Sequence, residues 1–214
     1  LNCFLIFYLS PKNSKIEKKP QKIITDGVDL DMFKPTNLKR FEHNKTLVVG
    51  WVGNSNWSHD IEDFKGFNTI IKPTILELQK EGIKIEPYYA DKQERMIPHD
   101  KMPEYYSKID VLLCASKCEG TPNPVLEAMA CGVPVISTNV GIVSEAFGKN
   151  QREYIIENRS KEELKNKILD LVNHSEKLKV LSEENLIQIK KWSWEKKVKD
   201  FKEFFDKNIV SGDE

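Results

Sequence analysis

The stretch "KCEGTPNPVLEAMACGVPVISTNVG", Lys117–Gly141, sets a polar loop, a helix and an apolar strand in close succession. Pro122 and Pro124 fit the first turn of a helix, where backbone N–H groups lack intrahelical partners in any case. The side chain of Thr121 or Asn123 is expected to cap that helix. A glycine then stops the helix, and the run "PVIST" predicts a strand.

The segments on either side continue this alternation of strands and helices. The strands are short continuous apolar runs rather than alternating ones, which is typical of a parallel sheet covered on both faces. We therefore predict an α/β fold, a doubly wound, Rossmann-like parallel sheet. The expected strands are 45–53, 83–90, 110–116, 134–141 and 153–157, and the expected helices are 67–82, 102–109, 123–132, 144–148, 160–192 and 193–205.

Several local signals refine these boundaries. Pro73 is expected to kink the first long helix or mark a restart, and Pro87 to weaken the end of its strand. Gly27 is expected to supply a backbone conformation that other residues resist. Ser160 and Glu163 stand at the spacing of a capping box.

The loop before the proline-opened helix is the candidate ligand site. Ligands of such sheets bind at the carboxyl ends of the strands, beside helix N-termini that attract phosphate. We expect the amides of Thr121, Asn123 and Val125 to be free for an anion. Glu127 is placed to accept hydrogen bonds from a vicinal diol such as ribose, and Glu119 to face another part of the same ligand. Taken alone, such a loop with two glutamates is more often structural than functional.

Composition argues against several other classes. Lysine plus arginine equals aspartate plus glutamate, 33 against 33, so no global basic field indicates nucleic acid. The cysteines and histidines form no set at zinc-ligand spacing, and we predict no metal site. The apolar run "LNCFLIFYL" is too short to span a bilayer and makes a poor signal peptide. Because the chain starts at Leu1 rather than methionine, we expect a fragment of a longer protein, and its cysteines are expected to be reduced structural thiols of a cytoplasmic protein.

The quoted stretch strongly resembles the acid-x7-acid motif of the retaining GT-B glycosyltransferases of family 4. Glu119 and Glu127 take the two acidic positions, and "GVPVISTNVG" with Glu145 also matches. The segments "ITDGVDLDMFKP", "VVGWVGN", "DFKGF" and "MPEYYSKIDVLLCAS" resemble further family segments in the same order. The similarity covers about Ile23 to Trp194, and it implies one half of a GT-B fold.

The resemblance implies a role for each matching position. It places Glu127 on the ribose hydroxyls of a nucleotide sugar, Glu119 on the transferred sugar and Lys65 on the diphosphate, with Glu119 and Lys65 as catalytic residues. It implies no cofactor, the donor being a UDP- or GDP-type sugar that serves as substrate. The donor-binding residues implied by the resemblance are Gly53, Asn54, Lys65, Arg95, Ile97, Pro98, Glu119, Gly120, Thr121, Pro122, Asn123 and Glu127.

The sequence departs from the family in two ways. Asn54 and its neighbours stand where family members usually carry an arginine, so the second positive charge is absent there or comes from elsewhere. We expect the family's acceptor-binding N-terminal domain to lie outside this sequence, and the fragment alone to be inactive. We divide the chain into a remnant and linker, 1–22, a nucleotide-sugar-binding domain, 23–193, and a C-terminal helix and tail, 194–214.

The resemblance thus implies transfer of a hexosyl group to a glycan, lipid-linked or protein acceptor, as in polysaccharide biosynthesis. Its expected partners are the nucleotide sugar and the missing acceptor domain, without nucleic acid, and the full-length protein is expected to associate peripherally with a membrane. Two alternatives stay open: a non-catalytic GT-B-like binding module, and a nucleotide-sugar epimerase of the same fold.

Overall fold

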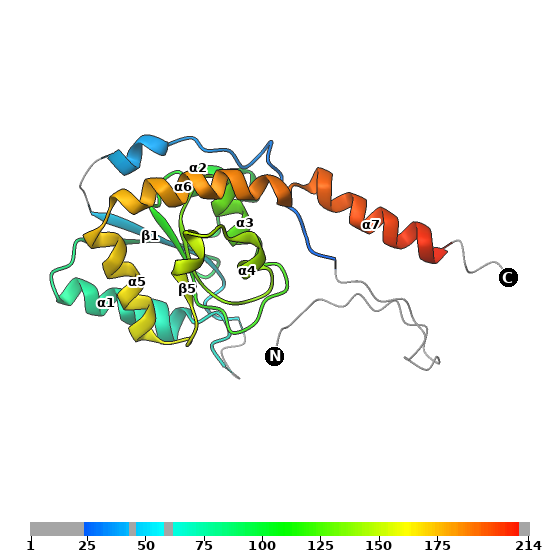
Figure 1. Ribbon diagram of the computed structural model, residues 1–214. Helices are drawn as coiled ribbons and strands as arrows, with labels where there is room; N and C mark the ends of the chain where they lie inside the picture. The colour runs from blue at the N-terminus through cyan, green and yellow to red at the C-terminus, as the bar shows by residue number, and fades with distance from the viewer. Residues whose placement is uncertain (1–23, 43–45, 58–61, 210–214) are drawn as a thin grey trace.

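Parallel strands form one sheet in the computed structural model, which describes residues 24–42, 46–57 and 62–209 (Figure 1). The strand order is β2-β1-β3-β4-β5, and every neighbouring pair is parallel. This confirms the predicted doubly wound α/β fold. The strands are β1 (Leu47–Gly53), β2 (Ile85–Asp91), β3 (Val111–Cys114), β4 (Val135–Thr138) and β5 (Ile155–Ile156).

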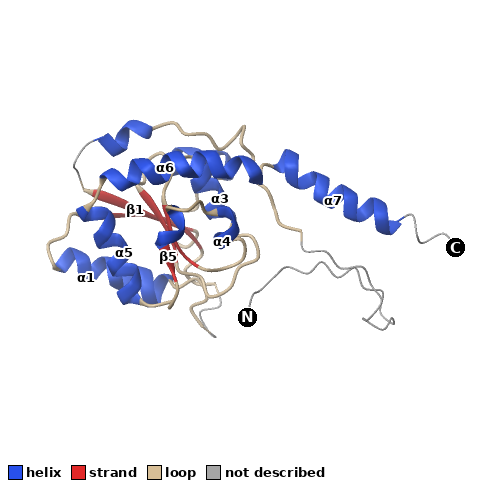
Figure 2. Cartoon of the chain, in the orientation of Figure 1, coloured by secondary structure: helices blue, strands red, loops and turns tan. Residues whose placement is uncertain are grey.

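Helices cover both faces of this sheet (Figure 2). Side chains of α2 and α3 pack in one buried cluster, and those of α1 and α5 pack in the other, on the opposite face. The α-helices are α1 (Lys72–Lys80), α2 (Met102–Tyr106), α3 (Asn123–Ala130), α4 (Val143–Ala146), α5 (Lys161–Asn173), α6 (Glu176–Gln188) and α7 (Trp194–Ile209). The π-helix η3 (Phe67–Ile71) and the 3-10 helices η2 (Leu38–Glu42), η4 (His99–Lys101), η5 (Gln151–Tyr154) and η6 (Ile189–Trp192) complete the elements.

The alternation of side chains along β1 explains why one strand serves two cores. Val49 and Trp51 belong to the cluster on the α1 and α5 face, whereas Val48 and Val52 pack against the cluster on the α2 and α3 face. A central strand that is apolar on both faces is what a sheet covered by helices on each side requires. The continuous apolar run of the sequence is therefore the direct cause of this layered arrangement.

The proline signals were correct in part. Pro73 lies at the first turn of α1, directly after η3, so the helix restarts there as predicted. Pro87 lies in the middle of β2 rather than at a weakened end. It is tolerated because β2 pairs with β1 alone and forms an edge of the sheet, where a missing N–H costs no ladder bond.

Gly27 is needed for a different reason than predicted. It is absent from the glycines with positive φ among the described residues. A Cβ at Gly27 would instead lie 2.9 Å from the backbone of Trp194, where the segment that precedes η2 crosses the start of α7. Val28 and Ser193 pair there in an isolated parallel bridge. Close approach of two backbones, not an unusual dihedral angle, fixes this glycine.

The capping prediction for α5 was half correct. Ser160 Oγ accepts a hydrogen bond from Glu163 N at 3.2 Å, as in a capping box. The Glu163 carboxylate, however, accepts from the backbone N and the side chain of Asn158, not from Ser160. The helix start is therefore held by two separate contacts.

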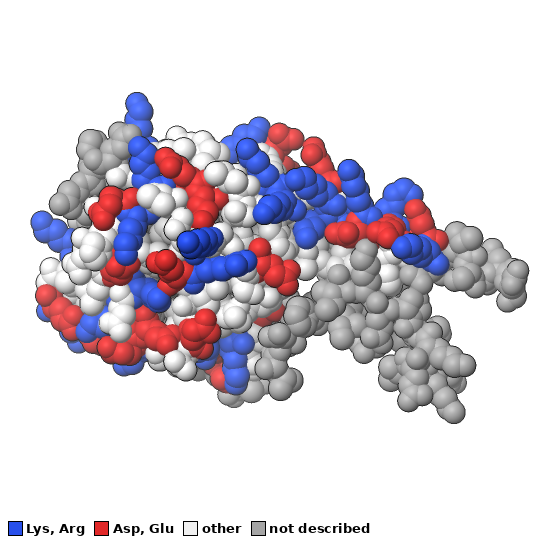
Figure 3. Space-filling model, viewed as in Figure 1, with Lys and Arg blue, Asp and Glu red and all other residues white. Residues whose placement is uncertain are grey.

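The helix α7 begins at Trp194, one residue after the expected start at 193, extends to Ile209 beyond the expected end at 205, and projects away from the sheet (Figure 1). The predicted remnant 1–22 lies outside the described residues, so the proposed division into domains stays a prediction. Basic (Lys and Arg) and acidic (Asp and Glu) side chains are intermixed over the face shown in Figure 3. This mixed surface agrees with the equal numbers of basic and acidic residues.

Candidate functional site

The strand order places a topological switch point between β1 and β3. The chain leaves β1 for β2 on one side, and returns to β3 on the other side of β1. Loops that follow the two strands therefore diverge at their carboxyl ends and leave a crevice, which is where open α/β sheets bind ligands. The loop after β1 carries Lys65, and the loop after β3 carries Glu119.

Lys65 and Glu119 meet across this crevice. Lys65 Nζ lies 2.5 Å from Glu119 Oε1, and the two side chains are 29% and 17% exposed. They line a small recess together with Cys114, Ser116 and Pro122. Burial raises the pKa of the Cys114 thiol, with Glu119 adding to the shift, so the sulfur is a neutral wall of this recess.

Arg159 fastens the loop that carries Lys65 to the end of β3. Its guanidinium donates one hydrogen bond to the carbonyl of Asp63 and another, of 2.7 Å, to the carbonyl of Ala115. Gly66, with φ +66°, lies so close that a Cβ would be 2.4 Å from the Ala115 oxygen. A side chain 44 residues beyond Ala115 thus holds the Lys65 loop against the Glu119 loop.

Gly141 fixes the other side of the Glu119 loop. Its φ is +51°, and a Cβ there would lie 1.9 Å from the carbonyl oxygen of Gly120 and 3.0 Å from that of Glu119. The glycine that ends "STNVG" therefore has a packing role. It allows the loop after β4 to lie directly against the loop that positions the Glu119 carboxylate.

Glu127 lies in the second turn of α3 and accepts a hydrogen bond from a buried tyrosine. Tyr106 Oη donates to Glu127 Oε2 at 2.7 Å. Burial raises the pKa of Glu127, while the Tyr106 hydroxyl and His99 oppose the shift. One carboxylate oxygen is thus held by the protein, in an environment that favours hydrogen bonding to the other oxygen.

The start of α3 differs from the prediction in its details. Pro122 is the N-cap residue and no side chain caps the helix, so neither Thr121 nor Asn123 acts as predicted. Thr121 Oγ1 instead accepts from Asp26 N at 3.1 Å. The amide of Val125 is not free, because it donates to the Pro122 carbonyl at 2.8 Å. Asn123 remains exposed as the first helical residue.

Asn54, at the position of the expected arginine, forms a turn and supplies no positive charge. Its side-chain oxygen accepts from Asn56 N at 3.0 Å and from Gln93 Nε2 at 2.8 Å. Its carbonyl accepts from Trp57 N at 3.1 Å, which closes a four-residue turn. Gly53 precedes this turn at the end of β1, and a Cβ there would meet the ring of Trp51 at 2.6 Å.

Arg95, Ile97 and Pro98 line a second recess, with Tyr88 and other residues, beyond the carboxyl end of β2. The Arg95 guanidinium lies over the Tyr88 ring, 4.7 Å from its centroid. The predicted site residues are therefore divided in the structure. Lys65, Glu119 and Pro122 share one recess, the base-region residues share another, and Glu127 lies on α3.

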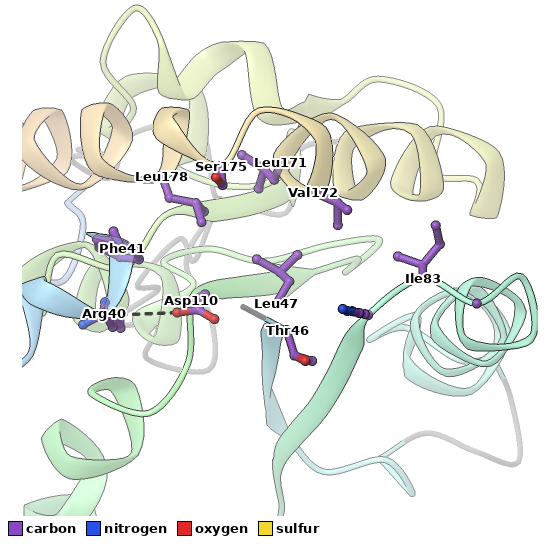
Figure 4. Close-up of a pocket in the computed structure, with 12 residues that line it drawn as sticks. Arg40, Phe41, Thr46, Leu47, Ile83, Asp110, Leu171, Val172, Ser175 and Leu178 are labelled. Carbon is purple, nitrogen blue, oxygen red and sulfur yellow. Dashed lines mark ion pairs between the residues drawn. The ribbon is translucent and has the colours of Figure 1, made fainter. Parts of the chain in front are cut away.

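A further recess lies at the opposite end of the strands, near the amino ends of β1 and β3 (Figure 4). Leu47, Ile83 and Leu171 contribute apolar walls, and Arg40 and Asp110 form an ion pair with a 3.9 Å separation. Burial lowers the pKa of Arg40 to about 10, although Asp110 opposes the shift. Ser175, the N-cap residue of α6, also lines this recess, but Asp110 is the single acid among its lining residues and is paired with Arg40. We therefore assign the ligand to the switch point, where Lys65 and Glu119 meet.

Sequence reasoning missed Tyr106, Arg159 and Trp57. Tyr106 was placed correctly on a short helix, but nothing local showed that its hydroxyl reaches Glu127, 21 residues away. Arg159 follows β5, and its partners lie 44 and 96 residues earlier. Only the assembled sheet brings these groups together. Arg159 lies three residues beyond the end of β5, and its neighbours in the sequence gave no signal of these partners.

The described residues include no group of three histidine, cysteine, aspartate or glutamate side chains that could hold a metal ion. A bilayer crossing needs a long apolar helix, and none of the described helices meets that requirement.

Residues 94–188 match the family model described as Glycosyl transferases group 1. A segment of 107 residues is 34% identical to the uncharacterized glycosyltransferase MJ1178 of Methanocaldococcus jannaschii. That segment covers 50% of this chain and 30% of the relative. The matched segment therefore spans about a third of the relative's length.

Solved structures share the fold. Sucrose-phosphate synthase from Thermosynechococcus elongatus superposes with a TM-score of 0.70 and 16% identity, over 89% of this chain and 53% of that one. Anabaena HepE (Alr3699), crystallised in complex with UDP-glucose, superposes with a TM-score of 0.62 and 15% identity, over 87% and 57%. At these identities the likeness supports the fold alone.

Proposed function

Since residues 94–188 belong to the glycosyl transferases group 1 family, with GT-B glycosyltransferases as structural neighbours, we propose that this chain is the donor-binding half of a glycosyltransferase. The proposed reaction moves a hexosyl group from a UDP- or GDP-type sugar to a glycan, lipid-linked or protein acceptor. The acceptor would be held by a domain outside this chain. Binding of UDP-glucose by HepE, a protein of the same fold, supports the donor class.

The proposed donor lies across the switch point, with its diphosphate at the start of α3. The N-terminus of the eight-residue helix α3 would face this position through the amide of Asn123, because Pro124 has no N–H and Val125 N already donates to the Pro122 carbonyl. Lys65 would neutralise the diphosphate, and Glu119 would accept hydrogen bonds from hydroxyl groups of the transferred sugar. Glu127 would accept hydrogen bonds from the ribose through the oxygen that Tyr106 leaves available.

These groups suit the charges that develop in the reaction. As the anomeric C–O bond breaks, positive charge grows on the sugar and negative charge grows on the departing diphosphate. A lysine and a helix N-terminus that are already in place stabilise that negative charge without reorganisation. In the proposed arrangement the Glu119 carboxylate would lie on the side where positive charge develops. We propose that transfer is metal-independent and retains the anomeric configuration, as the acid-x7-acid motif implies.

The single observation that carries this proposal is the meeting of Lys65 and Glu119 at the switch point. Fifty-four residues separate them, yet Arg159, Gly66 and Gly141 hold their loops together. The test is calorimetric titration of this chain with UDP, GDP, UDP-glucose and GDP-mannose. We expect one nucleotide series to bind, and Glu127→Ala to weaken the binding of both members of that series.

Glu183→Ala is the matched control, because Glu183 is an exposed glutamate on α6, away from the switch point. It should bind the same ligands as the wild type. Failure of the wild type to bind any of the four ligands would refute donor binding. Chelation of divalent cations with EDTA should leave the affinity unchanged, and a large loss would refute the metal-independent proposal.

A second candidate function is a GT-B-like module that binds a nucleotide sugar without transferring it. The observation that favours it is Asn54, which occupies the place of the expected arginine and is committed to a turn. Glycoside formation by the full-length protein, measured with a radiolabelled donor, separates the two. Binding without any transfer would support the module.

A further inference from the structure

The turn that replaces the expected arginine presents an exposed tryptophan beside the site. Trp57 is 54% exposed, although a large aromatic side chain gains free energy from burial. Its ring and that of Phe64 are in a T-shaped arrangement, with centroids 5.9 Å apart and an interplanar angle of 69°. Lys65 Nζ lies 5.7 Å from the Trp57 ring centroid and 2.5 Å from Glu119. The indole is therefore a direct neighbour of the proposed diphosphate and sugar contacts.

Hydrogen bonds hold this turn in place. Trp57 N donates to the Asn54 carbonyl, and the Asn54 side chain accepts from Asn56 N and Gln93 Nε2. Ser55 N donates to Asp91 Oδ1 at 3.0 Å, and the Ser55 carbonyl accepts from Asn68 Nδ2 at 2.9 Å. The turn is thus tied to the end of β2 and to η3. The exposure of Trp57 follows from this fixed geometry.

A pyranose ring is the ligand group that such a surface fits. One face of a pyranose carries several C–H groups with partial positive charge, and they pack on the negative face of an aromatic ring. Lys65 competes weakly for the indole, because 5.7 Å is close to the limit of about 6 Å for a cation–π contact. The adjacent Glu119 carboxylate can accept hydrogen bonds from hydroxyl groups of the same ring.

We propose that Trp57 is a sugar-binding residue, on which the pyranose ring of the donor stacks while Glu119 binds its hydroxyl groups. This inference rests on the proposed function and extends it to a residue outside the family's acidic motif. Where family members usually carry an arginine, the turn from Asn54 to Trp57 then presents an aromatic surface to the ligand. Recognition by Trp57 is directed at the sugar and not at the nucleotide.

The test compares the affinities of a nucleoside diphosphate and its sugar in each variant, by calorimetry with the pairs UDP and UDP-glucose, and GDP and GDP-mannose. Trp57→Ala should weaken binding of the nucleotide sugar by about threefold to tenfold, and change that of the diphosphate by less than about twofold. Trp57→Phe should recover part of the loss. Trp194→Ala, at another exposed tryptophan, should change neither affinity.

Thermal melting of each variant checks that the fold is intact. An equal loss for both ligands would overturn the proposal, because the indole would then act through Lys65 or through the fold. Unchanged affinity for the nucleotide sugar would also overturn it. A wild-type chain that binds no nucleotide would refute the proposed function itself, and this result is visible before any variant is made.

Discussion

Lys65 Nζ and Glu119 Oε1 lie 2.5 Å apart, so two groups that we assign to different parts of a sugar diphosphate bind each other in the structure. A diphosphate that occupies the switch point would compete with Glu119 for the lysine. The same exchange would release the Glu119 carboxylate for hydroxyl groups of the sugar. The ion pair is therefore expected to keep both side chains oriented toward the crevice until a donor separates them.

The first prediction concerns this exchange. Glu119→Gln removes the carboxylate that competes for Lys65, so we expect the nucleoside diphosphate to bind about twofold to fivefold more tightly. The nucleotide sugar should gain less, because a neutral amide is a weaker acceptor for its hydroxyl groups. Calorimetry with both ligands measures the two changes.

The matched control is Glu62→Gln. Glu62 pairs with Lys117, 2.7 Å away, on the same loop segment but with more exposed side chains. An exposed pair of this kind contributes little, so its loss should leave both affinities unchanged. Weaker binding of the diphosphate by Glu119→Gln would contradict competition for Lys65.

The second prediction concerns Glu127 and pH. Its pKa is raised above the ordinary value of 4.5, chiefly by burial, so the folded protein binds more protons than the unfolded chain between 4.5 and the raised pKa. The contribution of Glu127 to stability therefore falls as pH rises through that window. Glutamine does not titrate, and we expect the Tm of Glu127→Gln relative to wild type to be higher at pH 7 than at pH 4.

Thermal melting of wild type and Glu127→Gln at the two pH values checks this difference. The same variant should bind the nucleotide more weakly, so the residue would improve ligand affinity at the expense of stability. A Tm difference that does not change with pH would show that burial of the charge is unimportant here.

The third prediction concerns Arg159, which joins the two loops of the site. Arg159→Ala leaves the carbonyls of Asp63 and Ala115 without this donor, and should lower the free energy of unfolding by about 2 kcal/mol. It should also weaken diphosphate binding, because Lys65 loses its fixed position. Urea unfolding and calorimetry measure the two effects.

Arg152→Ala supplies the comparison. Arg152 also donates to a backbone carbonyl, that of Ser144 at 3.0 Å, but from an exposed position away from the switch point. Its loss should cost less than about 1 kcal/mol and spare the affinity. Equal behaviour of the two arginine variants would argue against a positioning role for Arg159.

The fourth prediction separates close contact from backbone strain. Gly141→Ala and Gly82→Ala both place a side chain at positive φ, +51° and +80°. Alanine at Gly82 meets nothing within 4 Å, so it should cost only about 1 kcal/mol of strain. Alanine at Gly141 would lie 1.9 Å from the Gly120 oxygen, so it should cost more and displace the Glu119 loop. Melting temperatures and nucleotide affinities that match in the two variants would contradict this role for Gly141.

The sheet could be predicted because its signals are local. The apolar run of β1 and the proline restart at Pro73 depend on residues within a few positions, and both appear where the sequence placed them. The position of Pro87 was misjudged because its tolerance depends on β2 lying at the sheet edge. The place of β2 at the sheet edge depends on how the strands assemble, and the local sequence around Pro87 does not reveal it.

The site could be predicted only in part, for the same physical reason. Glu119 and Lys65 were identified through a motif, but their ion pair depends on how two loops 54 residues apart approach each other. Thr121 was assigned to a helix cap from local preference, and a distant amide, that of Asp26, takes its oxygen instead. Tertiary partners decided these contacts, and neither Asp26 nor Arg159 carried a local sign of them.

The central claim is that the carboxyl edge of the sheet binds a nucleotide sugar. The most direct measurement is NMR mapping of backbone amide shifts in this chain on addition of the nucleoside diphosphate that binds. The account predicts the largest shifts at the amides of Lys65, Glu119, Gly120, Thr121, Asn123 and Glu127. Shifts confined to the amino ends of the strands, around Arg40 and Leu171, would contradict it. So would the absence of shifts at saturating nucleotide.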